Sequence, residues 1–439
     1  MSSTRFTRRR FVGTGAMLAG GLALAGPGRI PAALAQEAPV PLQVYVHLNH
    51  PFDNVKPLFE AKYPNITLDM MGTNDMQVFR ATLAANGEGT PDLFWPEASE
   101  VQEFGQAGAL LDVTDLIEEH KAELAPGKLA ECLIAKTGQY VAWPGDIAVI
   151  GLYYRDDLLN SAGVTIPEDW TWEEFIETGQ KIKQDTGAFS MTISTAGGDA
   201  TALPWTILAM QLGGSITNAD GTEVTLDNEA GIAAMVLLKQ IYDAGIHIDD
   251  SPFNETYFAA LAGGQIAISP LPVWYRGFGM EPAVTTPEQG LGQWRVALLP
   301  RASADSPRTA NYGGANIAST KYTQHPDEVK QFMVFALGTM EGAAACAEYG
   351  IVPPYLPFLE SETWFDQRSP IMGDFAYNEV WTECVKQYPT NWHKQPVFTE
   401  ALNEIGAQVP PMLNGEVEIE AGMKALGDRV RELNARYQG

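Results

Sequence analysis

Short strand-like runs alternate with helical patterns along this 439-residue chain, and the alternation limits the folds open to it. Residues 43–47 alternate apolar and polar side chains and predict a strand, and residues 54–63 carry apolar residues at helical spacing. A second strand is expected at 66–70, a helix at 76–86 and a third strand at 92–95. This order predicts α/β layers rather than an all-β or all-α protein. Later helices are expected over residues 171–185, 228–244, 327–337 and 417–437.

The first 35 residues have the pattern of a bacterial export signal. They hold five arginines and no acidic residue, followed by an uncharged stretch over 13–26 and by Ala33-Leu34-Ala35 before Gln36. The adjacent Arg8, Arg9 and Arg10 before Phe11 fit the twin-arginine version, which exports folded proteins. A cytosolic amphipathic helix is the alternative, but its glycines would each cost about 1 kcal/mol. We expect cleavage after Ala35 and a periplasmic protein.

The composition of the remaining chain restricts its partners. The whole chain carries a formal net charge of −26, and all 54 acidic residues lie after the leader. Such a charge argues against nucleic acid and anionic lipid as partners, because phosphate-binding surfaces need clustered lysine and arginine. After the leader no apolar run approaches the roughly 20 residues needed to cross a bilayer. The length predicts two or more domains in a soluble protein without a membrane anchor, since no cysteine at the cut offers a lipid site.

Motifs for metal, cofactor or catalytic chemistry are missing from the sequence. Cys132, Cys346 and Cys384 are too few for a disulfide framework, although one bridge between two of them is possible. His47 and His50 would need two further ligands to hold zinc, and the other histidines are scattered. No phosphate-binding loop, dinucleotide fingerprint or nucleophile elbow is present. We therefore expect no metal, no cofactor and no enzymatic activity.

The order of short motifs resembles a known family, the extracellular solute-binding proteins of sugar ABC transporters (bacterial solute-binding protein family 1). Each motif alone is weak, but together they follow the family's order across nearly the whole chain. The motifs are Phe59-Glu60 with Tyr63-Pro64-Asn65-Ile66, Leu83-Ala84-Ala85-Asn86-Gly87 with Thr90-Pro91-Asp92-Leu93, Gly108-Ala109-Leu110-Leu111-Asp112, Gly138-Gln139-Tyr140, Gly151-Leu152-Tyr153-Tyr154-Arg155, Thr171-Trp172-Glu173-Glu174-Phe175 and Gly313-Gly314.

The resemblance implies a type 2 periplasmic binding protein-like fold, in which two α/β lobes surround a ligand cleft. The chain would cross between the lobes three times, near residues 141–146, 301–312 and 351–357. Lobe one would then comprise residues 40–143 with 312–352. Lobe two would comprise residues 144–308 with 357–439.

The resemblance also implies a function. The protein would capture a carbohydrate in the cleft, deliver it to a membrane ABC permease, and work as a monomer. Two alternatives stay open at this point. One is the same binding role for an acidic sugar, a polyamine or a phosphodiester; the other is a secreted carbohydrate-active enzyme, since 54 acidic residues guarantee some carboxylate pairs by chance.

Aromatic residues at strand ends or in loops bounded by glycine or proline are the first candidates for ligand contacts. Open α/β sheets bind ligands outside the carboxyl ends of their strands. A sugar ring presents apolar C–H faces, which flat aromatic side chains can cover with little flexibility to lose. Each candidate has core packing as its alternative role. The candidates are Trp95, Trp205, Trp274 with Tyr275, Tyr312 with Gly313, and Trp392.

Four polar residues complete the predicted site. Asp146 follows the first expected crossing, and Glu97 and Asn49 stand at the ends of early strands. A buried charge-assisted hydrogen bond from a sugar hydroxyl to such a carboxylate is about twice as strong as a neutral one. Arg276 could stack on a neighbouring ring or bind a carboxylate of the ligand, and a structural ion pair is its equal alternative.

Overall fold

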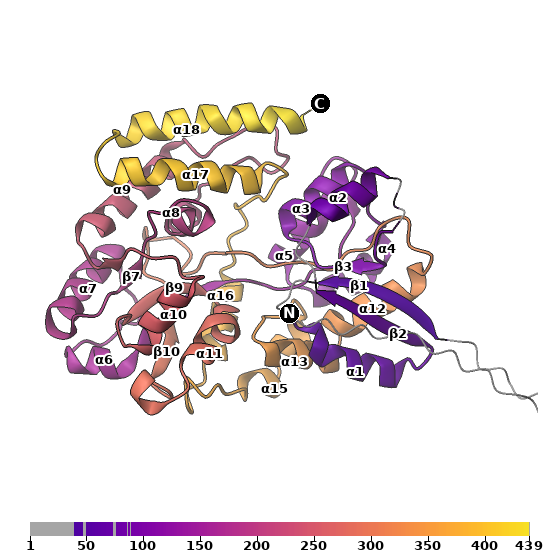
Figure 1. The fold of residues 1–439 in the computed structure, drawn as a ribbon, viewed down its shortest axis with the longest axis horizontal. Coiled ribbons are helices and arrows are strands. Elements are labelled where there is room, and N and C mark those ends of the chain that lie inside the picture. The colour runs from indigo at the N-terminus through magenta and orange to yellow at the C-terminus, as the bar shows by residue number, and fades with distance from the viewer. Residues whose placement is uncertain (1–38, 47–49, 73–75, 86, 88, 439) are drawn as a thin grey trace, which may run out of the picture. The chain divides into compact units, whose positions relative to one another are not determined.

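The computed structural model describes residues 39–46, 50–72, 76–85, 87 and 89–438 (Figure 1). The expected signal peptide over residues 1–35 and the candidate site residue Asn49 lie outside the described residues, as does His47 of the first expected strand. Strands and helices alternate through the described part, which confirms the α/β class. The four later helices that the sequence predicts appear as α7, α9, α12 and α18, with their ends shifted by only a few residues.

The described elements have the following bounds. The first half contains β1 (Val40–Val46), α1 (Phe52–Lys62), β2 (Ile66–Gly72), α2 (Met76–Ala84), β3 (Leu93–Phe94), α3 (Ala98–Gln106), α4 (Thr114–His120), α5 (Pro126–Cys132), β4 (Leu133–Ile134), β5 (Gln139–Tyr140), β6 (Ile150–Arg155), α6 (Asp156–Ser161), α7 (Trp172–Thr186), β7 (Met191–Thr192) and α8 (Asp199–Gln211). The second half contains α9 (Glu229–Asp243), β8 (His247–Ile248), α10 (Glu255–Ala262), β9 (Ile268–Pro272), the π-helical turn η2 (Arg276–Met280), α11 (Glu281–Ala283), β10 (Trp294–Ala297), α12 (Pro326–Gly338), α13 (Met340–Tyr349), α14 (Leu356–Leu359), α15 (Glu362–Phe365), α16 (Asn378–Lys386), α17 (Phe398–Leu413) and α18 (Ile419–Asn434).

A parallel sheet of three strands organises the N-terminal region. β1 lies between β2 and β3, and its register aligns Val44 with Met70 on one side and with Leu93 on the other. Helices α1, α12 and α13 pack together beside this sheet, where Phe59 meets Phe332 edge to face at 5.1 Å between ring centroids. The apolar residues of this first core come from 42–143 and 315–351.

A second sheet of three strands has β6 at its centre, antiparallel to β10 on one side and to β9 on the other. Helix α16 packs against β6 at Gly151, where a Cβ atom would lie 2.6 Å from the ring of Trp381. Glycine at this position therefore lets the helix approach the strand closely. Trp381 and Trp294 belong to an apolar cluster around this sheet, the third core, which also includes Ala343 and Ala347 of α13. Because α13 also contributes Ala345 and Cys346 to the first core, it packs on both.

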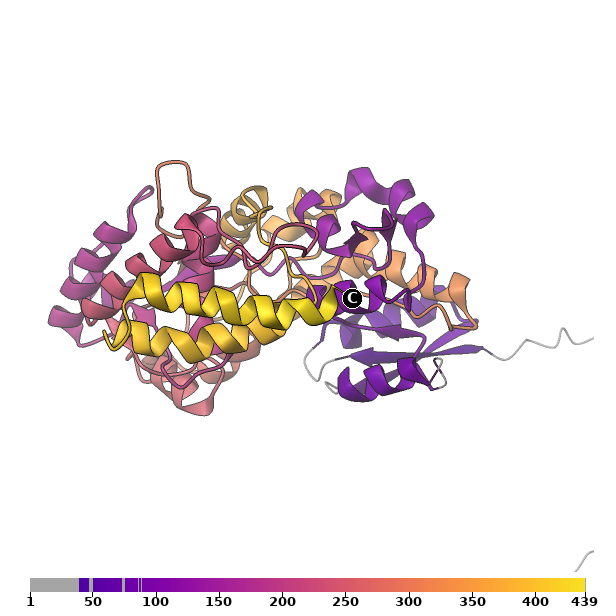
Figure 2. The same ribbon diagram turned by 90° about the horizontal axis from the view of Figure 1, so that it is seen from above.

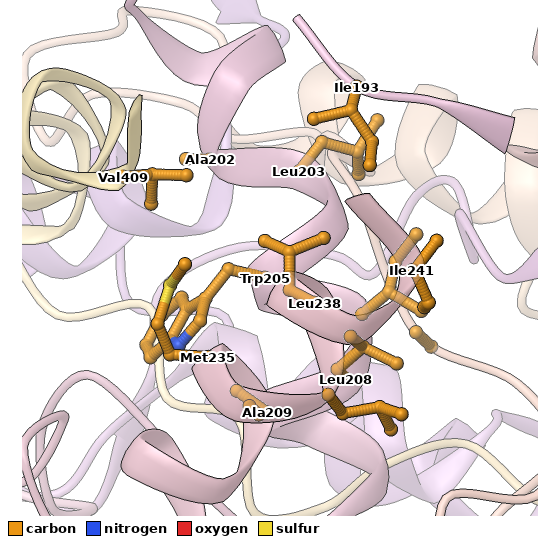
Figure 3. Close-up of a cluster of buried hydrophobic side chains, with 14 of the residues drawn as sticks. Ile193, Ala202, Leu203, Trp205, Leu208, Ala209, Met235, Leu238, Ile241 and Val409 are labelled. Carbon is orange, nitrogen blue, oxygen red and sulfur yellow. The ribbon is translucent and has the colours of Figure 1, made fainter. Parts of the chain in front are cut away.

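A further apolar cluster, which we call the second core, surrounds α8 (Figure 3). This helix is buried from Ala200 to Gln211. A helix that is apolar on every side must be covered on every side. Helices α9 and α17 pack directly on α8, and α18 packs on both of them. Figure 1 places α17 and α18 along the upper edge of this region, and Figure 2, which looks down on it, shows them side by side.

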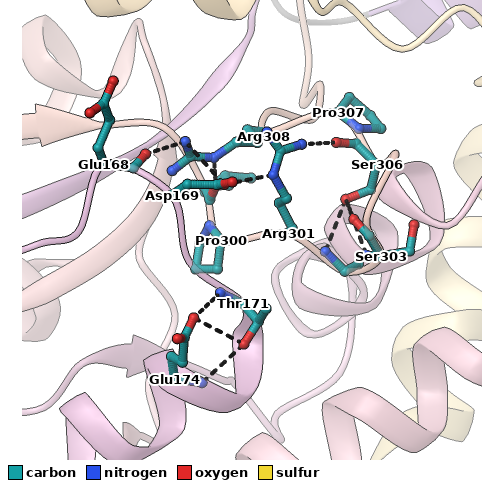
Figure 4. Close-up of polar contacts among 12 residues, drawn as sticks. Glu168, Asp169, Thr171, Glu174, Pro300, Arg301, Ser303, Ser306, Pro307 and Arg308 are labelled. Atoms are coloured by element: carbon teal, nitrogen blue, oxygen red, sulfur yellow. Dashed lines mark hydrogen bonds and ion pairs between the residues drawn. The ribbon is translucent and has the colours of Figure 1, made fainter.

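The start of α7 shows a local reason for its boundary (Figure 4). The Thr171 side chain accepts a hydrogen bond from the Glu174 backbone N–H, and the Thr171 N–H donates to Glu174 Oε2 at 2.7 Å. This reciprocal cap satisfies two backbone donors that would otherwise lack partners. Trp170 and Trp172 beside it are buried and pack against Phe175 of the helix. Arg301 Nε donates to Asp169 Oδ1 at 2.6 Å and ties the start of the second expected crossing to this helix start.

The three expected crossings lie side by side. Trp143 bridges to Ile317 in antiparallel fashion, and Val149 bridges to Asn311 in the same way. The backbone N–H of Ile147 donates to Val352 O at 2.9 Å. Segments near residues 143–149, 311–317 and 352 are therefore hydrogen-bonded neighbours between the two three-stranded sheets.

The cysteines and the helix lengths complete the description. Cys132, Cys346 and Cys384 are buried and free, so the structure contains no bridge between any two of them. No helix within the described ranges is both long enough and apolar enough to span a membrane.

Candidate ligand-binding cavity

A cavity of about 400 Å³ lies between the start of α3 and the start of α17, bordered by the second crossing. Its lining combines aromatic rings, carboxylates, amides and one ammonium group. The lining residues are Glu97, Ser99, Glu100, Asp199, Thr206, Trp274, Asn311, Tyr312, Gly313, Trp392, Lys394, Phe398, Thr399, Leu402 and Asn403.

A smaller cavity of about 180 Å³ adjoins it and shares three lining residues, Glu97, Trp274 and Gly313. Its other lining residues are Pro51, Trp95, Asp146, Phe278, Gly314, Ala315, Tyr349 and Ile351. The Trp274 side chain therefore contributes to the wall of both hollows. Together we call them the cavity.

Two lining rings of the cavity, Trp274 and Tyr312, are nearly parallel to a third ring, that of Phe253, which packs against both. Phe253 stacks on Tyr312 with 5.8 Å between centroids and 8° between planes, and on Trp274 with 6.1 Å and 22°. Trp274 follows β9, and its indole N–H donates to Tyr312 O at 3.1 Å, which fixes the ring against the second crossing. Because Trp274 is only partly buried, part of its ring remains open to a ligand.

Carboxylates come from the starts of two helices. Glu97 precedes α3, and its backbone N–H donates to Glu100 Oε2 at 3.0 Å. Burial, together with the nearby Glu97 charge, raises the pKa of Glu100 to about 7. Asp199 begins α8 and accepts a hydrogen bond of 2.8 Å from the Tyr312 hydroxyl. Burial and the Asp199 charge hold the pKa of Tyr312 well above its usual value, so the hydroxyl remains a donor.

Asp146, in the first crossing, lines the smaller cavity. It is 5% exposed and accepts a hydrogen bond of 3.3 Å from the Val352 backbone N–H in the third crossing. Burial raises the pKa of its carboxyl to about 7, although the nearby Lys128 charge opposes the shift. Asp146 is thus a buried acid that joins two of the crossings.

Lys394 places a positive charge in the cavity wall. Its ammonium donates to Gly313 O at 2.6 Å and lies 3.4 Å from Glu131 Oε1 of α5. Lys128 also pairs with Glu131 and donates to Gly314 O. Burial alone would raise the pKa of Glu131, but the charges of Lys128 and Lys394 outweigh it and lower that pKa. Burial lowers the pKa of Lys394 itself, against the pull of Glu131.

Seven of the eleven residues predicted from the sequence line the cavity. They are Trp95, Glu97, Asp146, Trp274, Tyr312, Gly313 and Trp392. They come from four separate stretches of sequence, at 95–97, 146, 274 and 312–313, with Trp392 as a fifth near the C-terminus. The folded chain brings them together at the ends of strands β3 and β9 and along two of the crossings.

The prediction that Trp205 stands in a loop at the cleft is wrong. Trp205 lies inside α8, is fully buried in the second core, and donates its indole N–H to Gly231 O at 3.0 Å (Figure 3). Pro204 beside it suggested a break in the chain, but α8 continues through the proline. Trp205 packs the helix and does not line the cavity.

Tyr275 and Arg276 also lie away from the cavity. Tyr275 is fully buried in the third core and donates its hydroxyl to Pro252 O. Arg276 is 6% exposed, pairs with Glu281 at 2.5 Å, and places its guanidinium 5.2 Å from the centroid of the Tyr377 ring. For Arg276 the structural ion pair, the alternative considered above, is the observed state.

Several lining residues were not predicted. Asp199, Glu100 and Lys394 carry charge into the cavity, and Asn311 and Phe398 add an amide and a ring. Asp199 follows Gly197-Gly198, a pair that could have marked an exposed loop before a helix. Nothing in the local sequence marks Lys394, because lysine is buried only when a distant partner pairs with it.

No group of three or more His, Cys, Asp and Glu side chains in the described part of the chain is placed to hold a metal ion. The cavity itself offers aromatic rings and hydrogen-bonding groups. It can cover apolar faces with Trp274 and Tyr312 and accept hydrogen bonds at Glu97, Glu100 and Asp199.

The fold is shared with a solved structure, the ABC transporter associated binding protein from B. animalis subsp. lactis in complex with β-1,6-galactobiose. The two match with a TM-score of 0.75 at 20% sequence identity, over 91% of this chain and 98% of that one. Two α/β lobes that surround a cavity and are joined by three crossings define the type 2 periplasmic-binding-protein class. The chain belongs to the bacterial extracellular solute-binding protein family, whose model matches residues 47–343.

Two characterised relatives are named as sugar-binding proteins. The chain is 28% identical over 385 residues to the lactose-binding protein of Rhizobium radiobacter. This match covers 84% of this chain and 86% of that protein. It is 27% identical over 259 residues to the arabinooligosaccharide-binding protein of Halalkalibacterium halodurans. That second match spans 57% of this chain and only 55% of the relative.

Proposed function

We propose that the protein is the exported substrate-binding component of an ABC importer, which captures a carbohydrate in the cavity and delivers it to a membrane permease. The observation that carries the proposal is the partly open Trp274 ring, fixed by its hydrogen bond to Tyr312 O, with Glu97 in the same cavity wall. The relatives named for lactose and for arabinooligosaccharides support a carbohydrate as the ligand. The proposed role needs no cofactor and no catalysis.

The proposed mechanism is closure of two lobes on the ligand. Lobe one comprises residues 40–143 with 312–352 and lobe two residues 144–308 with 357–439, with hinges near 141–146, 301–312 and 351–357. A ligand can shift an equilibrium between open and closed forms only if it binds the closed form better. Glu97 and Glu100 on one side, with Trp274 and Asp199 on the other, give a sugar contacts to both lobes.

Thermal melting against a panel of mono- and oligosaccharides tests the proposal. A ligand that binds only the folded state stabilises it by about 2.7 kcal/mol at 100 times its Kd, so at least one sugar should raise the melting temperature clearly. Absence of any shift with sugars would contradict the proposal. Chromatography of the sugars after incubation tests the absence of catalysis, because an enzyme would leave products.

A cationic ligand such as a polyamine is the second candidate, and the carboxylates of the cavity favour it. Glu97, Glu100 and Asp199 all line the larger hollow, whereas its one lysine is already paired with Glu131. Spermidine therefore belongs in the same melting panel, together with a phosphodiester as an anionic probe. A shift with spermidine but with no sugar would replace the carbohydrate by a cation.

Export through the twin-arginine route is part of the same proposal. The pattern over residues 1–35 supports cleavage after Ala35 and release into the periplasm. N-terminal sequencing of protein from the periplasmic fraction should begin at Gln36. Replacing Arg8 and Arg9 by lysine should leave the precursor in the cytoplasm.

A further inference from the structure

The loop between α16 and α17, residues 387–397, is anchored to the region of the second core (Figure 1). The Asn391 side chain donates to Gly214 O at 2.6 Å, and the Gln395 side chain donates to Ala219 O at 2.8 Å. Trp392 between them is 8% exposed and packs in the second core near Trp205. These contacts hold the loop on the segment that links α8 to α9.

The same loop also contacts two helices of the first core. The Gln106 side chain at the end of α3 donates to Gln395 Oε1 at 3.1 Å. Glu131 on α5 receives the Tyr388 hydroxyl at 2.8 Å and lies 3.4 Å from the Lys394 ammonium. The loop therefore connects the first and second cores through side-chain contacts, in addition to the crossings of the chain.

Lys394 connects this junction to the cavity. It donates to Gly313 O at 2.6 Å, next to Tyr312, whose backbone carbonyl accepts from Trp274. The Lys394 side chain is 4% exposed and the Glu131 side chain 9% exposed, so water competes little for either charge. A buried lysine that loses its carboxylate partner is strongly disfavoured, and separating the two cores at this point would break the pair.

We propose that residues 387–397 form a latch between the two lobes, and that Lys394 is a positioning residue for ligand binding. The latch forms when α5 and the loop meet, and it holds Gly313 and the Tyr312 carbonyl where Trp274 needs them. It raises the affinity for the ligand by favouring the binding-competent arrangement, because the apparent Kd scales inversely with the fraction of protein in that arrangement. This inference rests on the proposed carbohydrate-binding function.

The test compares Lys394→Met with Lys394→Arg by sugar titration and stopped-flow kinetics, using whichever sugar stabilises the wild type in the melting panel. Coupling between two sites of this kind typically changes affinity by roughly 5- to 150-fold. We expect Lys394→Met to raise Kd roughly tenfold, mainly through faster dissociation, and to increase the radius of gyration of the unliganded protein. Lys394→Arg retains a charge for Glu131 and should recover part of the affinity.

A matched control is Lys181→Met, which removes an exposed pair with Asp185 on α7, away from the cavity lining. It should change neither Kd nor the radius of gyration. Gln106→Ala removes the second contact of the latch from a partly exposed position and should raise Kd by a few fold even if Lys394→Met does not fold.

Each outcome separates the two proposals. If no sugar binds the wild type, the carbohydrate function fails and the latch has no ligand to act on. If the wild type binds but Lys394→Met lowers only the melting temperature, with Kd and scattering unchanged, Lys394 is merely structural and the latch is overturned. An unchanged Kd in Gln106→Ala overturns it as well when Lys394→Met does not fold.

Discussion

The second core and the cavity wall each contain a tryptophan held by the same kind of hydrogen bond. Trp205 in α8 donates to Gly231 O at 3.0 Å, and Trp274 after β9 donates to Tyr312 O at 3.1 Å. Trp205 is fully buried, whereas Trp274 is partly exposed and lines both hollows of the cavity. The bond to the indole N–H therefore says nothing about function. The open part of the ring distinguishes a binding surface from a packing surface.

The surroundings of Trp205 and Trp274 differ in polarity as well as in exposure. Trp205 lies in the apolar second core, with Met235 next to its ring (Figure 3). Trp274 stacks on Phe253 and lines a hollow that also contains carboxylates and amides. A change at Trp205 should therefore affect folding, and a change at Trp274 should affect binding.

The largest effect is expected for Trp205→Ala. Removing a fully buried tryptophan leaves a cavity in the core, and such changes cost about 3–5 kcal/mol of unfolding free energy. Urea denaturation followed by circular dichroism measures this loss, with Trp205→Phe as a milder control. The contrast with Trp274 would be broken if Trp205→Ala kept its stability and lost only sugar binding.

Asp146 in the cavity wall should make the stability of the protein depend on pH, which the apolar side chains of the second core cannot do. Its pKa is raised to about 7 in the folded protein by burial, against about 3.9 in an unfolded chain. Between these values the folded state keeps a proton that the unfolded state releases. The stabilisation is therefore fully present below about pH 4 and is lost as the pH rises to about 7, at up to about 1.4 kcal/mol per pH unit.

Asp146→Asn should remove the Asp146 share of this dependence, because an amide does not titrate and its oxygen can still accept from the Val352 N–H. Glu100, whose pKa burial also raises to about 7, should keep its own share. The measurement is the free energy of unfolding at several pH values from 4 to 8. Asp69→Asn, at an exposed position on β2, is the matched control and should keep the wild-type slope. Equal slopes in wild type and Asp146→Asn would show that this carboxyl does not hold the proton.

Trp274→Ala should weaken sugar binding by about 1–3 kcal/mol, because the exposed part of the ring provides the contact with the ligand. That range corresponds to roughly 5- to 150-fold in Kd. Isothermal titration gives the affinity, and the unfolding free energy should fall by less than in Trp205→Ala. If Trp274→Ala fails to fold while Trp274→Phe still binds the sugar, Trp274 is a packing residue of the core and not a ligand contact.

The sequence identified the lining residues at strand ends better than those at the starts of helices. Trp95 and Trp274 lie within two residues of the ends of buried strands, and the rule that ligands bind beyond the carboxyl ends of strands identifies them. The prediction for Trp205 was wrong because a proline inside a helix gives the same local signal as a proline in a loop. Only the packing around α8 distinguishes these two settings. The family resemblance supplied the order of the lobes, which local patterns could not.

The charged part of the cavity could not be predicted because it depends on contacts distant in sequence. Lys394 meets Glu131 across 263 positions of the chain, and Tyr312 meets Asp199 across 113. No periodicity in either segment encodes its partner. Arg276 is the opposite case, because its partner is close in sequence. Glu281 is only five residues away, and the ion pair with it keeps Arg276 out of the cavity.

The smallest effect is expected for Tyr312→Phe, which keeps the ring stacked on Phe253 and removes only the hydroxyl that donates to Asp199. A single hydrogen bond contributes about 0.5–1.5 kcal/mol, and the exposure of Asp199 places this one at the lower end. Sugar affinity should therefore fall by no more than a few fold, measured by the same titration. The double variant with Asp199→Asn isolates the pair. If Tyr312→Phe lost as much affinity as Trp274→Ala, the hydroxyl rather than the ring would be the binding group, and exposed ring surface would no longer separate the cavity wall from the core.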